Sequence, residues 1–132
     1  LSFDKSSLSP QLDRGESVSI DSVLDGGDSV HILPRERTLG RWKRQFLTAY
    51  DEKSDTLGLC IEPEYEGHEC LYNRHFKGQQ VIEGGFAELS PVAKVLKLYG
   101  KTTEYGQYPG QYSKNLLEKA LPDWSIDIEP DY

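Results

Sequence analysis

The chain has 132 residues and a formal net charge of −7, with 36% hydrophobic and 28% charged residues. This length fits a single domain, and no apolar run approaches the roughly 18 residues needed to span a bilayer. So acidic a chain is a poor candidate for a nucleic-acid-binding protein, because the phosphate backbone is also negatively charged.

We expect residues 1–17 to form an extended polar arm and residues 18–132 to form one domain. The arm is rich in Ser and Asp and holds few apolar side chains, so it buries too little surface to fold alone. It either frays or lies on a partner protein. Leu1 opens a chain that contains no Met, which leaves open a cleaved targeting segment and an organelle as the location.

Weak alternation over residues 18–24, a turn at 25–28 and an apolar run over 29–33 predict a β-hairpin that ends at Pro34. The following stretch, residues 35–44, is the basic cluster of the chain, with five bases and one acid. It is either a solvated loop or a surface for an acidic partner, with an indole for stacking. The candidate partner-binding residues here are Arg35, Arg37, Arg41, Trp42, Lys43 and Arg44.

Residues 45–63 predict the clearest hairpin, because β-branched and aromatic residues flank the polar turn DEKSD. Residues 62–79 predict a short helix or an irregular packed loop. This stretch contains His68, Cys70 and His75, but their spacing is not that of a common zinc site, so we expect no metal. Cys60 has nine residues between it and Cys70, a spacing compatible with a disulfide or with two free thiols.

Residues 79–100 predict two strands. Gly84 and Gly85 indicate a bulge or a close backbone approach in the first strand. Residues 92–99 form the second strand, which we expect to be central because it is the most apolar.

The C-terminal part predicts one helix and one strand. Residues 112–121 carry an amphipathic helical pattern with Ser113 as its N-cap and Pro122 as its end. Alternation over residues 124–129 predicts a half-buried final strand. The fold class is therefore α+β, with a mostly antiparallel or mixed sheet covered on one face by the C-terminal helix.

Three stretches of the C-terminal third, EGGFAEL, VLKLYGKTTEYG and SKNLLEKALPDWSIDIEPDY, together resemble the Janus/phosphohistidine phosphatase family over residues 82–132. The resemblance implies an α+β domain in which a His acts as general base and a polar loop binds phosphate without a cofactor. By this resemblance the anion-binding residues are Lys101, Thr102 and Thr103. Glu104 stands where a small neutral residue is expected.

The catalytic His and an Arg that the family uses for the phosphate are not matched. The position of the catalytic His falls on Phe46, and that of an Arg after the glycines falls on Phe86. We therefore expect a non-catalytic phosphohistidine-phosphatase-like domain that acts as a binding or assembly subunit of a larger complex. The alternative is a protein phosphohistidine phosphatase with His75 as general base.

We expect partner proteins to bind the N-terminal arm and the basic stretch 35–44. Tyr105, Tyr108 and Tyr112 are further candidates, because tyrosine supplies contact area at a low entropic cost. These tyrosines could instead fill space at the end of the sheet. We expect no nucleic-acid partner and no transmembrane segment, and peripheral association with a membrane complex stays open.

Overall fold

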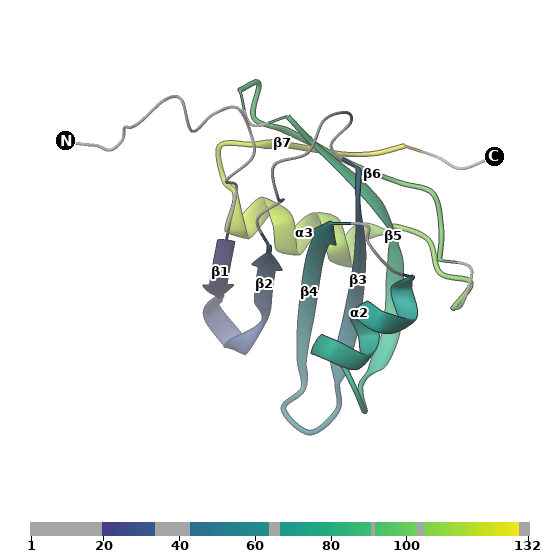
Figure 1. Cartoon of the computed structure of the whole chain (residues 1–132). Helices are drawn as coiled ribbons and strands as arrows, with labels where there is room; N and C mark the ends of the chain where they lie inside the picture. The colour runs from purple at the N-terminus through teal and green to yellow at the C-terminus, as the bar shows by residue number, and fades with distance from the viewer. Residues whose placement is uncertain (1–19, 34–42, 64–66, 91, 103–104, 130–132) are drawn as a thin grey trace.

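The computed structural model describes residues 20–33, 43–63, 67–90, 92–102 and 105–129. The elements in chain order are β1 (Ile20–Val23), a 3-10 turn η2 (Asp25–Gly27), β2 (Ser29–Ile32), β3 (Lys43–Asp51), β4 (Thr56–Pro63), α2 (His68–His75), β5 (Gln80–Ser90), β6 (Val95–Tyr99), α3 (Gln111–Ala120) and β7 (Ser125–Ile128). The described strands form one curled sheet in the order β1-β2-β4-β3-β5-β6-β7 (Figure 1).

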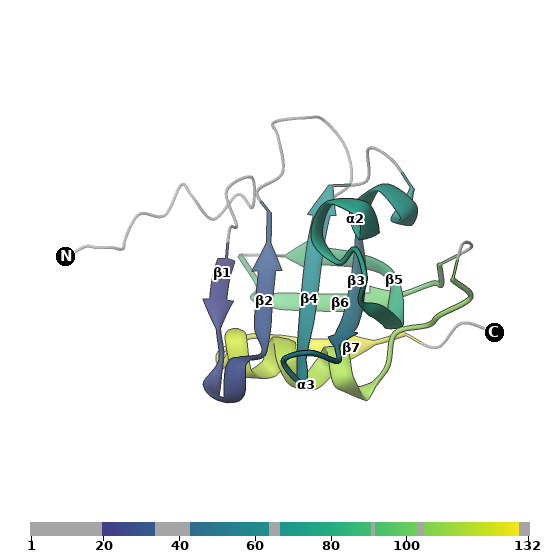
Figure 2. The same ribbon diagram turned by 90° about the horizontal axis from the view of Figure 1, so that it is seen from below.

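The sheet is mixed. β2 runs parallel to β4 and β6 runs parallel to β7, whereas the other neighbouring strands are antiparallel. α3 contacts β2 near one edge of the sheet and β7 at the other edge, so the sheet curls around this helix (Figure 2). The α+β class with a mixed sheet is therefore confirmed.

The two helices lie on opposite faces of the sheet, as the alternation along β4 shows. Leu59 and Ile61 belong to the larger apolar core, which packs against Leu117 of α3. Cys60, the residue between them, belongs to a smaller core with Leu71 of α2. The expectation of a sheet covered on one face is therefore wrong, because a second helix covers part of the other face.

Both predicted hairpins are confirmed, since β1 pairs with β2 and β3 pairs with β4, each pair antiparallel. The predicted strand 92–99 is shorter than expected and begins at Val95. Val92 is 77% exposed, and Lys94 has a positive φ of 57°, so these residues form the turn that precedes β6. β6 is also not central, because it lies next to the edge strand β7.

The C-terminal helix is confirmed, but its start differs from the expectation. Its N-cap is Gly110, which has no side chain and therefore cannot cap the helix itself. The carboxylate of Glu83 on β5 supplies the acceptors instead: Oε1 accepts from the backbone N–H groups of Gly110 and Ser113 at 3.1 and 2.7 Å, and Oε2 from that of Tyr112 at 3.1 Å. Ser113 thus lies within the first turn, and its hydroxyl also donates to Glu83.

The predicted N-terminal arm and most of the basic stretch, including Arg35, Arg37, Arg41 and Trp42, lie outside the described residues. Arg44 is described and is fully buried at the start of β3, where its guanidinium donates to the carbonyl of Leu33 at 2.9 Å. Within the described part of the chain, no helix is long and apolar enough to cross a membrane.

Candidate functional site

Two hollows flank the end of the sheet where β3 turns into β4. The first, called here the polar cavity, lies on the face that carries α2 and has a volume of about 220 Å³. The second, called the acid–aromatic groove, lies on the face that carries α3 and has a volume of about 360 Å³. The side chains of β3 and β4 alternate between the two faces, because successive residues of a strand point to opposite sides, and Leu57 borders both hollows.

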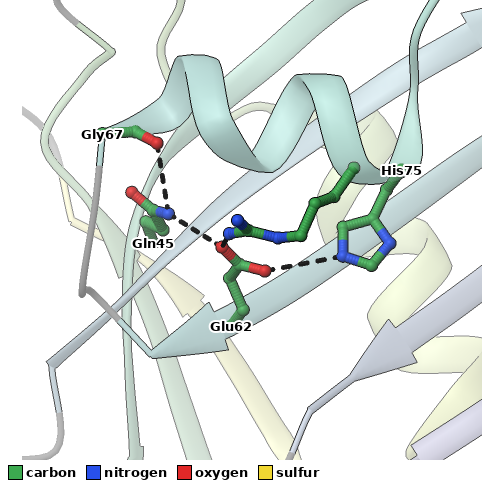
Figure 3. Close-up of polar contacts among 5 residues, drawn as sticks. Gln45, Glu62, Gly67 and His75 are labelled. Carbon is green, nitrogen blue, oxygen red and sulfur yellow. Dashed lines mark hydrogen bonds and ion pairs between the residues drawn. The ribbon is translucent and has the colours of Figure 1, made fainter.

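A buried polar cluster adjoins the polar cavity. Cys60 and Glu62 are two positions apart on β4 and so point to the same face, and His75 is the last residue of α2. The imidazole Nε2 of His75 lies 3.5 Å from Oε1 of Glu62 (Figure 3). Glu62 is 5% exposed, so this carboxylate depends on protein groups for its hydrogen bonds.

The second oxygen of the Glu62 carboxylate is held by two side chains. Nε2 of the buried Gln45 donates to Oε2 at 3.1 Å and also lies 3.4 Å from the carbonyl of Gly67. The guanidinium of Arg74 forms an ion pair with the same Oε2. These contacts fix the carboxylate so that Oε1 is directed toward His75.

The polar cavity is lined by hydroxyl, amide, imidazole, thiol and carboxylate groups beside apolar side chains. The ring of His31 lies across from His75, with 6.3 Å between the ring centroids. No Lys or Arg is among the described lining residues, which are Ser29, His31, Asp51, Thr56, Leu57, Gly58, Leu59, Cys60, His75, Phe76 and Gln79. The cavity therefore offers polar contacts without a permanent cation for an anionic ligand.

Cys60 and Cys70 do not form a disulfide. Burial raises the pKa of the Cys60 thiol to about 12, and the negative charge of Glu62 acts in the same direction while Arg74 opposes it. The thiol is therefore protonated at neutral pH. Because the thiolate is the nucleophilic form, Cys60 is poorly suited to nucleophilic catalysis in this environment.

We expect iodoacetamide to alkylate Cys70 before Cys60 in the native protein at pH 8. At this pH, a thiol with a pKa of about 12 is ionised in about one molecule in ten thousand. Cys60 is also fully buried, whereas Cys70 is half-buried. Peptide mass spectrometry after short labelling measures the two rates. In the variant Cys70→Ser, native labelling should be nearly absent and labelling in guanidinium complete. Equal rates at the two cysteines in the native wild type would contradict the expectation.

The acid–aromatic groove is lined by Asp28, Tyr50, Asp55, Leu57, Gln80, Ile82 and Tyr112. The Tyr50 hydroxyl donates to Oδ1 of Asp55 at 2.6 Å, and the backbone N–H of Leu57 donates to Oδ1 of Asp28 at 2.8 Å. The hydrogen bond to Asp55 raises the pKa of Tyr50, and desolvation and the charges of Asp55, Glu52 and Asp51 act in the same direction. Three carboxylates therefore surround this hydroxyl.

The turn predicted to bind an anion follows β6. Thr102 is fully buried, its backbone N–H donates to the carbonyl of Gln107 at 2.9 Å, and its hydroxyl accepts from the N–H of Gln107 at 3.1 Å. The ammonium of Lys101 lies 5.8 Å from the ring centroid of Tyr108. The backbone N–H and the hydroxyl of Thr102 are thus both used in hydrogen bonds that close the turn. Thr103 and Glu104 lie outside the described residues.

The three candidate tyrosines have different surroundings. Tyr108 is 47% exposed and Tyr112 is 57% exposed, so both present area to solvent. Tyr105 is half-buried, and its ring packs at 5.7 Å from that of Tyr72 on α2. Tyr112 also lines the acid–aromatic groove, whereas Tyr105 and Tyr108 do not.

Of the residues considered for metal binding, the structure brings only His75 into a group of possible ligands. His68 is buried, with Nε2 at 2.7 Å from the carbonyl of Gly85, and neither His68 nor Cys70 belongs to such a group within the described ranges. Cys60 and Glu62, which the sequence reasoning missed, complete the group with His75. Their spacing of two residues in a predicted strand was the available signal, because it places both on one face.

Comparisons with known proteins do not assign the chain to a family. No protein-family model matches it, and no curated protein is significantly similar to it.

Proposed function

We propose that this chain is a binding domain that takes a positively charged side chain of a partner protein, Arg or Lys, into the acid–aromatic groove. The observation that carries the proposal is the composition of the groove: two carboxylates and two tyrosines line it, with no Lys or Arg among its described lining residues. A cation above a tyrosine ring and beside a carboxylate is attracted by both.

The two carboxylates retain acceptors for such a cation. Asp28 and Asp55 each use Oδ1 for a hydrogen bond within the chain. Neither Oδ2 has a partner among the described residues. Tyr112, one of the tyrosines expected to bind a partner, forms part of the wall and is 57% exposed. The groove is therefore complementary in charge and shape to a guanidinium or ammonium group on an apolar stem.

The proposal keeps the expected class, a binding or assembly subunit, and adds the chemistry of the partner. The expected binding of partners by the N-terminal arm and by the basic stretch stays a prediction. Most of these residues lie outside the described ranges, and the side chain of Arg44 is buried. Membership of the phosphohistidine phosphatase family also stays a prediction.

The alternative, a phosphatase with His75 as base, has weaker support. A carboxylate behind the imidazole is typical of a general base. However, the polar cavity contains Asp51 and no described cationic side chain of Lys or Arg, which disfavours a phosphoryl group. The predicted anion-binding residue Thr102 is not among its lining residues.

The proposal is tested by NMR titration of the full chain with N-acetyl-arginine amide and N-acetyl-lysine amide. We expect amide shifts at Asp28, Leu57 and Tyr112, with a Kd of about 1 mM that increases with added salt. N-acetyl-glutamine amide, which is uncharged, should cause no saturable shift. Shifts that are absent, or that lie elsewhere on the chain, would overturn the proposal.

A charge-matched pair of variants separates the groove from the net charge. D28N/D55N keeps the Oδ1 acceptors and removes two charges, and we expect it to weaken binding at least tenfold, or about 1.4 kcal/mol. E118Q/D127N removes two exposed charges outside the groove and should leave the Kd within twofold. Equal weakening in both variants would mean that the ligand responds only to the net charge of the protein and not to the groove.

A further inference from the structure

We propose that Cys60, Glu62 and His75 form a binding site for a divalent transition-metal ion of the zinc type, with a fourth coordination position open to the polar cavity. This site lies on the opposite face of the sheet from the acid–aromatic groove, so it does not depend on the proposed function.

The spacing of the three side chains suits such an ion. One ligand atom from each residue lies within 4.8 Å of the others. The separation of His75 Nε2 and Glu62 Oε1, 3.5 Å, is close to that of two ligands bound to one tetrahedral ion, since bonds of about 2.0–2.2 Å place them about 3.3–3.6 Å apart. A sulfur and a nitrogen or oxygen bound to one zinc ion lie about 3.6 Å apart, so the sulfur of Cys60, within 4.8 Å of the other two ligand atoms, would move closer to them by about 1.2 Å at most.

The surroundings of Glu62 resemble the support that metal ligands receive. Gln45 and Arg74 both bind Oε2 of Glu62, so that the carboxylate is oriented and Oε1 remains available to an ion beside His75 (Figure 3). Outer hydrogen bonds of this kind fix the orientation of ligating carboxylates and raise metal affinity. Besides its ion pair with Arg74, this carboxylate has His75 at its other oxygen and Cys60 within the same group of possible ligands.

The type of ion follows from the donor atoms. When an ion binds, the Cys60 thiol releases its proton to solvent and becomes the ligating thiolate. A thiolate, an imidazole and a carboxylate form a mixed set that favours Zn²⁺ and related ions over Mg²⁺ or Ca²⁺, which prefer oxygen ligands alone. Cys60 and His75 both line the polar cavity, so an ion bound by them would lie at its wall, and the cavity leaves room for a water molecule as fourth ligand. His31 faces His75 across the cavity but does not belong to the ligand group.

The test is titration of the reduced, tag-free full chain with Co²⁺ under nitrogen. We expect one equivalent to bind and to produce the near-ultraviolet charge-transfer band of a Co²⁺–thiolate bond, and one equivalent of Zn²⁺ to abolish the band. Native mass spectrometry should show one zinc ion per chain. Absence of the band at a tenfold excess of Co²⁺, or binding without it, would overturn the proposal.

Variants locate the site. Cys60→Ser, Glu62→Gln and His75→Gln should each weaken Zn²⁺ binding at least tenfold, and Cys60→Ser should also remove the band. Cys70→Ser is the matched control at the other cysteine, and with His31→Gln it should keep both the band and the affinity within threefold. A band that survives in Cys60→Ser or is lost in Cys70→Ser would place the ion elsewhere and refute the site.

A measurement on the wild type covers the case in which a variant does not fold. With ¹¹³Cd²⁺ bound, NMR should give one cadmium resonance in the range of a site with a single thiolate, and scalar coupling from the metal to the His75 ring. A resonance in the range of purely oxygen ligation, or coupling to the ring of His31 or His68 instead, would contradict the assignment.

Discussion

The variant Glu83→Ala should lose about 3–4 kcal/mol of unfolding free energy, because it leaves buried hydrogen-bond donors without an acceptor. Glu83 is 8% exposed, and its two carboxylate oxygens receive three backbone N–H groups at the start of α3 and the hydroxyl of Ser113. The N-terminus of a helix also carries a partial positive charge that favours a carboxylate there. Urea unfolding followed by circular dichroism measures the loss.

Two further variants show whether the loss comes from this cap. Glu83→Gln keeps one acceptor oxygen in a side chain of the same size, and we expect it to lose about half as much as Glu83→Ala. Glu118→Ala, on the exposed face of the same helix, should change the free energy by less than about 0.5 kcal/mol. If Glu83→Ala lowered the unfolding free energy by less than about 1 kcal/mol, water would have to accept the hydrogen bonds of the N–H groups at the start of α3. The contacts of Glu83 would then contribute little to stability.

Glu83 also illustrates why parts of the fold could not be read from the sequence. The pattern of residues 112–121 predicts a helix, and Ser113 is a favourable N-cap residue in isolation. In the structure the cap comes from a residue 30 positions away, on β5. A local pattern cannot reveal an acceptor that arrives through strand pairing, so the existence of α3 was predictable and its first residue was not.

The strands show the same division between local and long-range information. The hairpins β1–β2 and β3–β4 follow from alternating runs separated by short polar turns, and both were predicted. The position of β6 beside the edge strand was not, because its apolar character reflects packing against α3 and not a central place in the sheet. The parallel pairing of β2 with β4 likewise brings together strands that are not consecutive in the chain.

The candidate sites were predicted least well. His75 and Tyr112 were named as candidates, but their neighbours Glu62 and Asp28 were not. The groove combines residues from several strands and α3, and the proposed metal site combines β4 with α2. One sequence contains no information on which of its many carboxylates lie beside such partners. The spacing of Cys60 and Glu62 along β4 was the detectable part, since strand periodicity alone places these two side chains together.

The paired glycines of β5 are the clearest case in which a pattern in the sequence corresponds to a steric requirement of the fold. Gly84 and Gly85 were expected to mark a bulge or a close approach, and the close approach occurs: a Cβ on Gly85 would lie 2.5 Å from the carbonyl oxygen of Tyr99. The register shift between β3 and β5 lies at Ile82, before the glycines, which pair regularly with Leu47 and Phe46. Gly85 also has a φ of +150°, which residues with a side chain rarely adopt.

We therefore expect Gly85→Ala to lose about 3–5 kcal/mol of unfolding free energy, the sum of backbone strain and of overpacking against a backbone atom that cannot move alone. Thermal unfolding and urea unfolding of the full chain both report the loss. Because the carbonyl of Gly85 accepts from His68 at the start of α2, the variant should also shift the NMR resonances of that ring.

Gly78→Ala separates strain from steric overlap. Gly78 has a φ of +88°, but a Cβ there would meet nothing within 4 Å among the described residues, so its loss should be about 1–2 kcal/mol from the left-handed backbone alone. The difference between the two variants then measures the cost of separating Gly85 from Tyr99, which keeps β5 and the end of β6 in close contact. Equal losses would mean that the carbonyl of Tyr99 moves away freely, and the close approach would then contribute nothing to specifying the curled sheet.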